Sequence, residues 1–261
     1  MAPLDGRVAV VTGVSRTAGI GFAVARRLLA DGASVLCHSW APHDAEQPWG
    51  ADPLGPDGVV AALGAPPERV HHLAADMADP SVPAAVVAAV VERFGAVDAV
   101  VANHARSATG TLAEVTAEEL DACWAVNARA SVLLAQALAA RHDDARPGGR
   151  LVLFTSGQHR APMAAELPYA ISKGAIHQMT LSLSDALADR GITVNTVNPG
   201  PTDTGWATPE LAEQVGRGLP RGRWTRPDEV AAVVAWLVSD DAAPVTGTVV
   251  DTEAGFRRWV R

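Results

Sequence analysis

Residues 8–21 read VAVVTGVSRTAGIG and join a short apolar run to the start of a helical pattern. The run Val8–Thr12 is typical of a buried strand, and glycines follow it at positions 13, 19 and 21. Glycines at a strand-to-helix turn let backbone amides approach a phosphate group, which then lies at the positive end of the helix. A structural tight turn is the alternative, but the place between the first strand and the first helix favours a dinucleotide-binding turn.

The same alternation of apolar runs and helical patterns continues to the end of the chain. Continuous apolar strands are typical of parallel sheets buried on both faces, and strand–helix alternation requires right-handed crossovers. We therefore predict an α/β fold over residues 1–261: a single Rossmann-type, doubly wound parallel sheet of about seven strands with helices on both faces. Strands are expected at Val8–Thr12, Ser34–His38, Val70–Ala74, Ala99–Ala102, Leu151–Thr155, Thr193–Val197 and Thr248–Asp251, and helices at Ile20–Asp31, Val82–Phe94, Ala117–Arg141, Tyr169–Arg190 and Asp228–Val238.

Two segments fit this alternation poorly. Trp40–Pro67 is rich in proline, with a weak helical pattern only at Val59–Leu63, and we expect a long irregular excursion there. Pro199–Pro227 is a second loop-rich zone before the last helix. Strand patterns continue on both sides of each segment, so neither is expected to be a domain linker.

The composition narrows the class of protein. A formal net charge of −8 with scattered arginines argues against a nucleic-acid surface, which requires a clustered basic excess. The two cysteines, Cys37 and Cys123, are too few for a disulfide scaffold, and they are expected to be core thiols. No signal-peptide pattern opens the sequence, and no apolar run approaches the roughly 20 residues that span a bilayer. We expect a cytoplasmic protein without nucleic-acid or membrane partners.

The chain contains one tyrosine, Tyr169, and one lysine, Lys173, four residues apart. On a helix such residues share a face, with Cβ atoms roughly 5–6 Å apart. An ammonium group beside a phenol favours the phenolate, so it lowers a pKa that starts near 10 and lets the phenol exchange a proton near neutral pH. A surface pair on an amphipathic helix is the alternative interpretation of the bare Y-x-x-x-K pattern.

With these motifs the chain resembles the short-chain dehydrogenase/reductase family over essentially its whole length. The Thr-Gly-x-x-x-Gly-x-Gly loop of that family is matched at Gly13, Gly19 and Gly21, with two extra residues between the first two glycines. The extension predicts an enlarged phosphate loop. The resemblance also implies a catalytic serine thirteen residues before the tyrosine and an asparagine in the helix before the fifth strand. The implied catalytic residues are Asn127, Ser156, Tyr169 and Lys173.

The resemblance implies hydride transfer between a nicotinamide cofactor and a carbonyl carbon. Ser156 would donate a hydrogen bond to the carbonyl oxygen, and Tyr169 would deliver the proton as general acid. Lys173 would lower the tyrosine pKa and hold the nicotinamide ribose, and Asn127 would order a water that links Lys173 to solvent. The family's enoyl reductases space the tyrosine and lysine more widely, so this spacing disfavours reduction of a carbon–carbon double bond. Alcohol oxidation, epimerisation and a non-catalytic, dinucleotide-binding regulatory role remain alternatives.

The cofactor contacts follow from the same resemblance. Asp76-Met77 resembles the pair beside the adenine ring, and Pro199-Gly200-Pro201-Thr202 resembles the segment that flanks the nicotinamide. In the Asn-Asn-Ala-Gly motif the second asparagine is matched by Asn103, but His104 follows it, and this histidine either points into the substrate cleft or is hydrogen-bonded in the loop. The predicted cofactor-binding residues are Gly13, Ser15, Arg16, Gly19, Ile20, Gly21, Ser39, Asp76, Met77, Asn103, Tyr169, Lys173, Pro199, Gly200 and Thr202.

The second predicted strand bears on the choice of cofactor. NAD enzymes place an acid at its end to bind the ribose 2′-hydroxyl. Ser39 falls at that position here, and a serine does not repel a 2′-phosphate, while Arg16 supplies positive charge in the glycine loop. Trp40 replaces the arginine that is common in NADP enzymes. We predict a preference for NADP(H) over NAD(H).

The substrate is expected between variable loops near residues 158–167 and 200–225, with His104–Thr109 beside them. Met163, Leu167 and Trp206 are expected to form apolar walls, with Gln158 and His159 as polar anchors. Pro209–Gly218 is expected to form a short lid helix. A medium-sized ketone, a 3-oxoacyl thioester or a polyketide intermediate would suit such a site. By family analogy we also expect a homo-oligomer, a tetramer or a dimer, assembled through the helices at Ala117–Arg141 and Tyr169–Arg190.

Overall fold

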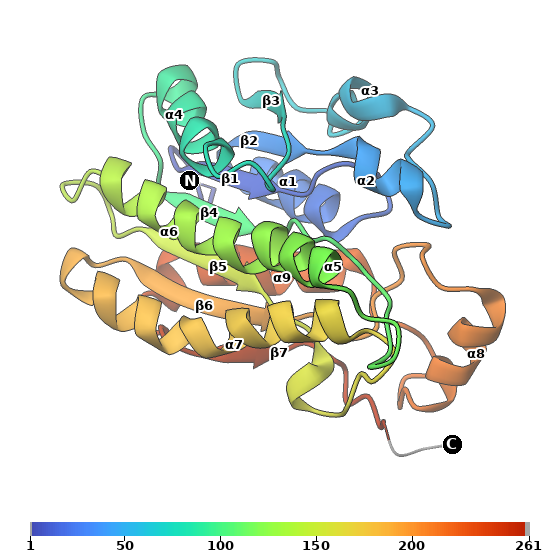
Figure 1. The fold of residues 1–261 in the computed structure, drawn as a ribbon. Helices are drawn as coiled ribbons and strands as arrows, with labels where there is room; N and C mark the ends of the chain where they lie inside the picture. The colour runs from blue at the N-terminus through green and yellow to red at the C-terminus, as the bar shows by residue number, and fades with distance from the viewer. Residues whose placement is uncertain (1, 259–261) are drawn as a thin grey trace.

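Within residues 2–258, which the computed structural model describes, seven strands pair in parallel to form one sheet (Figure 1). The strand order is β3-β2-β1-β4-β5-β6-β7, so the chain starts in the middle, moves to one edge and then crosses to the other. This order creates a switch point between β1 and β4, where ligands lie in doubly wound sheets. The predicted bounds are correct to within one residue for β1 (Val8–Thr12), β2 (Ser34–Ser39), β3 (Val70–Ala74), β4 (Ala99–Ala102), β5 (Arg150–Phe154), β6 (Thr193–Asn198) and β7 (Val249–Asp251).

Helices cover both faces of the sheet, as predicted. Successive strand residues point to opposite faces, and in β1 this divides Ala9 and Val11 from Val8 and Val10, which belong to two separate apolar clusters. One cluster lies under α1 (Ile20–Ala30) and α9 (Pro227–Val238). The other lies under the helices on the near side of Figure 1, which are α4 (Val82–Phe94), α5 (Ala117–Cys123), α6 (Ala130–Arg141) and α7 (Leu167–Leu187).

The helix predicted at 117–141 is continuous but not uniform. Between α5 and α6 the residues Trp124–Arg129 form a π-helical turn, a local widening that is frequent at functional sites. The 25 residues from Ala117 to Arg141 are also long and apolar enough to cross a membrane, with a mean hydropathy of 1.2 over the most apolar window. Half of that window is buried within the protein, where α6 packs against α4 and the sheet.

The excursion after β2 contains more helix than the sequence analysis predicted. It forms α2 (Ala41–Glu46) and α3 (Gly55–Ala61), each with a proline in its first turn, where a missing N–H costs no hydrogen bond. The lid helix α8 (Pro209–Arg217) forms as predicted, capped by the Thr208 side chain. In Figure 1, α2 and α8 stand at the same end of the sheet, beyond the carboxyl ends of the strands.

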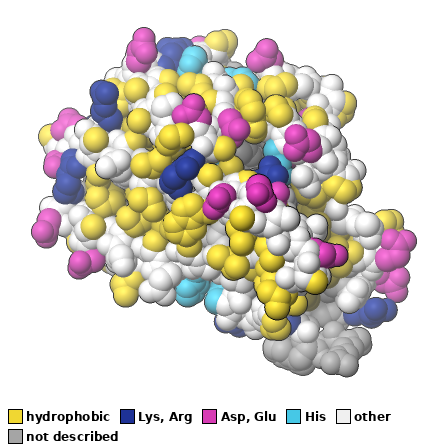
Figure 2. All heavy atoms as spheres, viewed as in Figure 1, with side chains coloured by type: hydrophobic (Ala, Val, Ile, Leu, Met, Phe, Trp, Pro, Cys, Tyr) yellow, Lys and Arg dark blue, Asp and Glu magenta, His cyan; other side chains and the backbone are white. Residues whose placement is uncertain are grey.

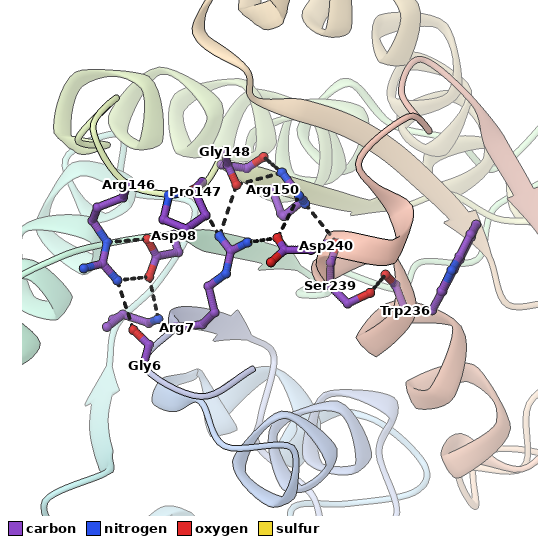
Figure 3. Close-up of polar contacts among 12 residues, drawn as sticks. Gly6, Arg7, Asp98, Arg146, Pro147, Gly148, Arg150, Trp236, Ser239 and Asp240 are labelled. Atoms are coloured by element: carbon purple, nitrogen blue, oxygen red, sulfur yellow. Dashed lines mark hydrogen bonds and ion pairs between the residues drawn. The ribbon is translucent and has the colours of Figure 1, made fainter. Parts of the chain in front are cut away.

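A polar network ties the opposite end of the sheet together (Figure 3). Asp98, fully buried, accepts hydrogen bonds from Val8 N at 2.8 Å and from Arg146 Nε at 2.6 Å. Beside it the buried Arg7 and Arg150 both face the Asp240 carboxylate. These bonds join the amino ends of β1 and β5 to the start of β4. The charged groups at this end, opposite α2 and α8, therefore stabilise the sheet.

Apolar side chains gather on the outer face of α5, α6 and α7, the face seen in Figure 2. Trp124 is 50% exposed, Ile171 56% and Leu181 68%. Large apolar side chains on neighbouring helices are the kind of surface that subunit contacts cover. The predicted association through these helices remains a proposal.

Candidate active site

The loops at the carboxyl ends of the strands enclose one cavity of about 1350 Å³. This volume exceeds that of a typical drug-sized site and can hold a dinucleotide with a small substrate. The cavity lies at the switch point between β1 and β4 and extends under α8. Most of the predicted site residues line it, namely Gly13, Ser15, Arg16, Gly19, Ile20, Asp76, Met77, Asn103, Ser156, Tyr169, Lys173, Pro199, Gly200 and Thr202.

The glycine turn is built so that backbone groups face this cavity. Gly13 has a φ of +73°, and a Cβ there would lie 2.9 Å from Asn103 Nδ2. A Cβ on Gly21 would overlap the Gly13 carbonyl oxygen, so the turn closes only without a side chain. Gly19 caps α1 without a side-chain hydrogen bond, and no acidic residue occupies the first turn. The positive end of α1 is therefore open to an anion, and these residues fit the pyrophosphate of a dinucleotide.

The two extra residues of the glycine loop are engaged by the excursion after β2. Thr17 donates to Asp52 Oδ2 through its N–H at 2.8 Å and its hydroxyl at 2.7 Å. Arg16 donates to the carbonyl of Thr204 at 2.9 Å, and its guanidinium lies 5.9 Å from the centre of the Trp49 ring. The extended loop is thus attached both to the excursion and to the segment before α8. Trp40 and the residues from Pro42 to Trp49, except Ala45, line the cavity beside it.

The structure decides between the two interpretations of His104. Its Nε2 lies 2.9 Å from the carbonyl oxygen of Val126, and its Nδ1 lies 2.7 Å from Thr12 Oγ1. Burial lowers the pKa of His104 to about 3, so the ring is neutral. A carbonyl only accepts, so Nε2 carries the proton and Nδ1 accepts from the threonine hydroxyl. His104 is therefore hydrogen-bonded within its loop, where it also forms part of the cavity wall.

Ser156, Tyr169 and Lys173 meet in the cavity wall. Ser156 lies two residues after the end of β5, and α7 presents Tyr169 and Lys173 on one face, as the four-residue spacing predicts. Lys173 is only 2% exposed, and its Nζ donates to the carbonyl oxygen of Phe154 at 2.9 Å. That nitrogen lies 5.7 Å from the centre of the Tyr169 ring. The two residues, four apart in sequence, thus bring a half-buried phenol close to a buried amine.

The two pKa values differ from the simple expectation of a lowered tyrosine pKa. Burial raises the pKa of Tyr169 to about 12, and the nearby Ser156 side chain opposes the rise only in part. Burial also lowers the pKa of Lys173 to about 8. Desolvation disfavours the charged form of both groups, and it is the largest cause of both shifts. Tyr169 is accordingly protonated at neutral pH and is suited to donate a proton.

Asn127 lies in the π-helical turn, fully buried and beside the cavity rather than in its lining. Its Nδ2 donates to Ser172 Oγ at 2.9 Å and to the Arg106 carbonyl at 3.0 Å, while its Oδ1 accepts from Arg106 N at 2.7 Å. The side chain thus joins the loop after β4 to α7. The predicted role of Asn127 in ordering a water beside Lys173 remains a proposal.

The prediction that Ser39 faces the cofactor is wrong. Ser39 is fully buried, and its Oγ lies 2.8 Å from His72 Nε2. His38 and Trp40 line the cavity instead. Neighbouring residues of a strand point to opposite sides, so a position that is off by one residue reverses the side chain.

The far end of the cavity, under α8, is apolar. Met163 and Trp206 line it as predicted, and Leu211, Trp224 and Phe256 complete the wall. Trp224 also donates from Nε1 to the Ala212 carbonyl at 3.0 Å, which holds α8 in place.

Three residues predicted to contact the substrate, Gln158, His159 and Leu167, are not among the described residues that line the cavity. Gln158 donates to Thr155 Oγ1 at 3.0 Å. His159 faces Asp251 at 3.2 Å. Gln158 Nε2 and the His159 ring thus find partners within the protein, whereas Gln158 Oε1 has no hydrogen-bond partner among the described residues.

Several charged residues at this end were missed by the sequence analysis. Arg106 is paired with Glu119, with an Nε–Oε1 distance of 2.8 Å. Arg258 reaches Gly157 from the C-terminal segment and is paired with the buried Glu253. Glu166 also lines the cavity, immediately before α7. Only Glu166 had a signal in the sequence, its place three residues before the tyrosine.

The comparisons with known proteins agree with this geometry. A family model described as enoyl-(acyl carrier protein) reductase matches residues 13–257. An uncharacterised oxidoreductase of Bacillus subtilis (strain 168) is 34% identical over 253 residues, which cover 97% of each chain. A putative ketoacyl reductase of the granaticin polyketide synthase of Streptomyces violaceoruber is 33% identical and covers 97% of this chain and 93% of its own.

A solved structure shows that the fold is also shared. A short-chain dehydrogenase from Burkholderia cenocepacia J2315 in complex with NADP has a TM-score of 0.83 and 33% identity, with 97% of this chain and 98% of that chain covered. The chain belongs to the short-chain dehydrogenase/reductase family. It is an oxidoreductase of a family that binds a nicotinamide dinucleotide and acts on small-molecule substrates.

Proposed function

We propose that the protein is a carbonyl reductase that converts a ketone to a secondary alcohol with a nicotinamide cofactor. The observation that carries the proposal is the convergence of Ser156, Tyr169 and Lys173 in one cavity with the open end of α1. The bound cofactor supplies the hydride. Ser156 donates a hydrogen bond to the carbonyl oxygen, and Tyr169 transfers its phenolic proton to that oxygen as negative charge develops.

The pKa values support the direction of reduction. Tyr169, with a pKa of about 12, holds its proton at neutral pH, as a general acid must. Lys173, with a pKa of about 8, is still mostly protonated at pH 7 and places a positive charge beneath the phenol. That charge stabilises the phenolate left after proton transfer. The protonated state of Tyr169 and the positive charge of Lys173 suit donation to a developing alkoxide, which is a stronger base than the phenolate.

The spacing of the pair favours carbonyl groups over carbon–carbon double bonds. The matching family model is described by an enoyl reductase, whereas the Streptomyces relative is a putative ketoacyl reductase. Tyr169 and Lys173 are four residues apart, which resembles the carbonyl-reducing members. We therefore expect turnover of ketones and none of an enoyl thioester such as crotonyl-coenzyme A.

We propose NADP(H) as the preferred cofactor. With Ser39 turned away, the support comes from Arg16, which lines the cavity and is engaged by a carbonyl rather than by a carboxylate. A guanidinium there suits a 2′-phosphate. The Michaelis constants for NADPH and NADH measure the preference, and a lower constant for NADH would refute it.

The mutation Tyr169→Phe tests the reaction. It removes the proton donor but keeps the ring, so we expect kcat to fall by about 10²–10⁴-fold, the usual contribution of a general acid. NADPH affinity, measured by fluorescence titration, should stay within about twofold of wild type. Unchanged turnover across a panel of aryl and alkyl ketones would show that Tyr169 is not the acid.

A further inference from the structure

Glu166 is a carboxylate in the wall of the substrate end that the proposed reaction does not use. It lies three residues before Tyr169, and its backbone is held on both sides. Its N–H donates to the Met163 carbonyl at 3.1 Å, and its own carbonyl accepts from Ala170 N at 2.8 Å. These bonds fix the backbone of Glu166 at the start of α7, where the residue forms part of the cavity wall.

The Glu166 side chain neither caps a helix nor forms an ion pair within the described residues. Glu166 is the N-cap residue of α7, but its side chain makes no capping hydrogen bond. In residues 2–258 no lysine, arginine or histidine nitrogen lies within 4.0 Å of its carboxylate oxygens. It is half-buried, and burial raises its pKa. A carboxylate kept in this position without a partner is available to a ligand.

Two arginines in the cavity wall at this end are already paired with carboxylates. Glu119 neutralises Arg106, and Glu253 neutralises Arg258. The negative charge of Glu166 is also close enough to the phenol to raise the pKa of Tyr169. Glu166 therefore places a carboxylate without an ion-pair partner among residues 2–258 in a wall that also contains the apolar Met163 and Trp206.

We propose that Glu166 determines specificity by favouring ketones that carry a positively charged group near the carbonyl and by disfavouring anionic ketones. The expected substrate has an apolar body, which packs under α8, and an ammonium-type group that faces Glu166. The proposal rests on the proposed carbonyl reduction and names the substrate class for the same site. It assigns Glu166 to substrate binding and not to the proton transfer itself.

Three aryl ketones of similar shape isolate the charge. Phenacyltrimethylammonium is cationic, 3,3-dimethyl-1-phenylbutan-1-one is its neutral isostere, and benzoylacetate is anionic. The substituents also change the intrinsic reactivity of the carbonyl. The informative quantity is therefore the ratio of kcat/KM between two ketones, compared between wild type and variant, because intrinsic reactivity cancels in that comparison. The variant is Glu166→Gln, which keeps the shape and removes the charge.

In Glu166→Gln we expect the cation-to-neutral ratio to fall about tenfold and the anion-to-neutral ratio to rise about tenfold, because a unit charge a few ångströms away in a partly screened site acts with this magnitude. Glu166→Asp should keep the wild-type order of the three ketones. The matched control is Glu118→Gln, an exposed glutamate on α5 outside the cavity that changes the net charge equally, and it should leave both ratios unchanged. Ratios in Glu166→Gln equal to those of wild type would overturn the proposal.

Binding separates this proposal from the proposed reaction. Isothermal titration of the NADP⁺ complexes of wild type and Glu166→Gln with each ketone reports affinity without turnover. If wild type binds in the order cation, neutral, anion and the variant loses that order, but no ketone is reduced, then the selectivity stands and the proposed reaction fails. If ketones are reduced and wild type binds the anion as tightly as the cation, the Glu166 proposal fails while the reaction stands. The wild-type titration also decides the matter if Glu166→Gln does not fold.

Discussion

Replacing Lys173 with methionine should stabilise the protein while it removes activity. The amine is 2% exposed, and burial moves its pKa from 10.5 to about 8. This change corresponds to about 3 kcal/mol of unfavourable free energy for carrying the protonated amine in the folded state. Methionine has a similar length and no charge, so it fills the space without that cost.

The net gain is smaller, because the substitution also removes a hydrogen bond. Lys173 Nζ donates to the Phe154 carbonyl at 2.9 Å, and losing one such bond costs about 1–2 kcal/mol. We therefore expect the free energy of unfolding of Lys173→Met to rise by about 1–2 kcal/mol at pH 7. For a chain of this size that corresponds to an increase in Tm of about 3–6 °C. Turnover should fall strongly, since the charge beneath Tyr169 is lost.

Urea unfolding at two pH values tests both the size and the sign. The folded-state pKa is lower than the unfolded one, so the penalty is complete below pH 8 and decreases as the pH rises toward 10.5. The difference between Lys173→Met and wild type should therefore be largest at pH 7 and mostly gone at pH 9.5. Lys173→Arg keeps a charge at this position and should not be stabilised. A less stable Lys173→Met protein at pH 7 would refute the reasoning.

Two further predictions concern groups that hold the site from outside. Asp98→Asn should lower the free energy of unfolding by about 2–4 kcal/mol, because it weakens the bonds of a buried carboxylate to Val8 N and Arg146. The active site lies at the opposite end of the sheet, so kcat/KM of the folded protein should stay unchanged. Urea unfolding and steady-state kinetics measure the two quantities, and a parallel loss of kcat/KM would contradict the prediction. Asp52→Ala releases the extended glycine loop and should weaken NADPH binding about three- to tenfold, as measured by fluorescence titration. Glu68→Ala, which replaces an exposed glutamate, is the control. Equal NADPH affinities of Asp52→Ala and wild type would contradict the prediction.

Much of the fold was predictable because local patterns repeat faithfully in this chain. Buried parallel strands are continuous apolar runs, so their bounds were found to within one residue. Helical residues four apart share a face in any surroundings, which brought Tyr169 and Lys173 together. The π-helical turn at Trp124–Arg129 had no such local signal, and its neighbour across the interface is α7.

The candidate site was predicted less completely, and its errors have one cause. Whether a side chain faces a cavity depends on where a strand ends and on what packs beside it. Ser39 is turned toward His72 of the neighbouring strand, so His38 and Trp40 face the cavity. Gln158 likewise finds Thr155 as a partner within the protein. The Ser39 contact joins strands that are distant in sequence, whereas the Gln158 contact is local and depends on how the turn after β5 folds.

By itself, the sequence determined the order of strands and helices, the phosphate-binding turn and the spacing of Ser156, Tyr169 and Lys173, since each depends on residues close together in the chain. Only the tertiary structure decided the attachment of Asp52 to the glycine loop, the burial that sets the pKa values of the pair, and the exposure of Glu166 to the cavity. The physical reason is that desolvation and ion pairing depend on which atoms surround a group in space. Arg106 and Arg258 are each paired with a glutamate, whereas no cationic side chain within residues 2–258 lies within 4.0 Å of the Glu166 carboxylate.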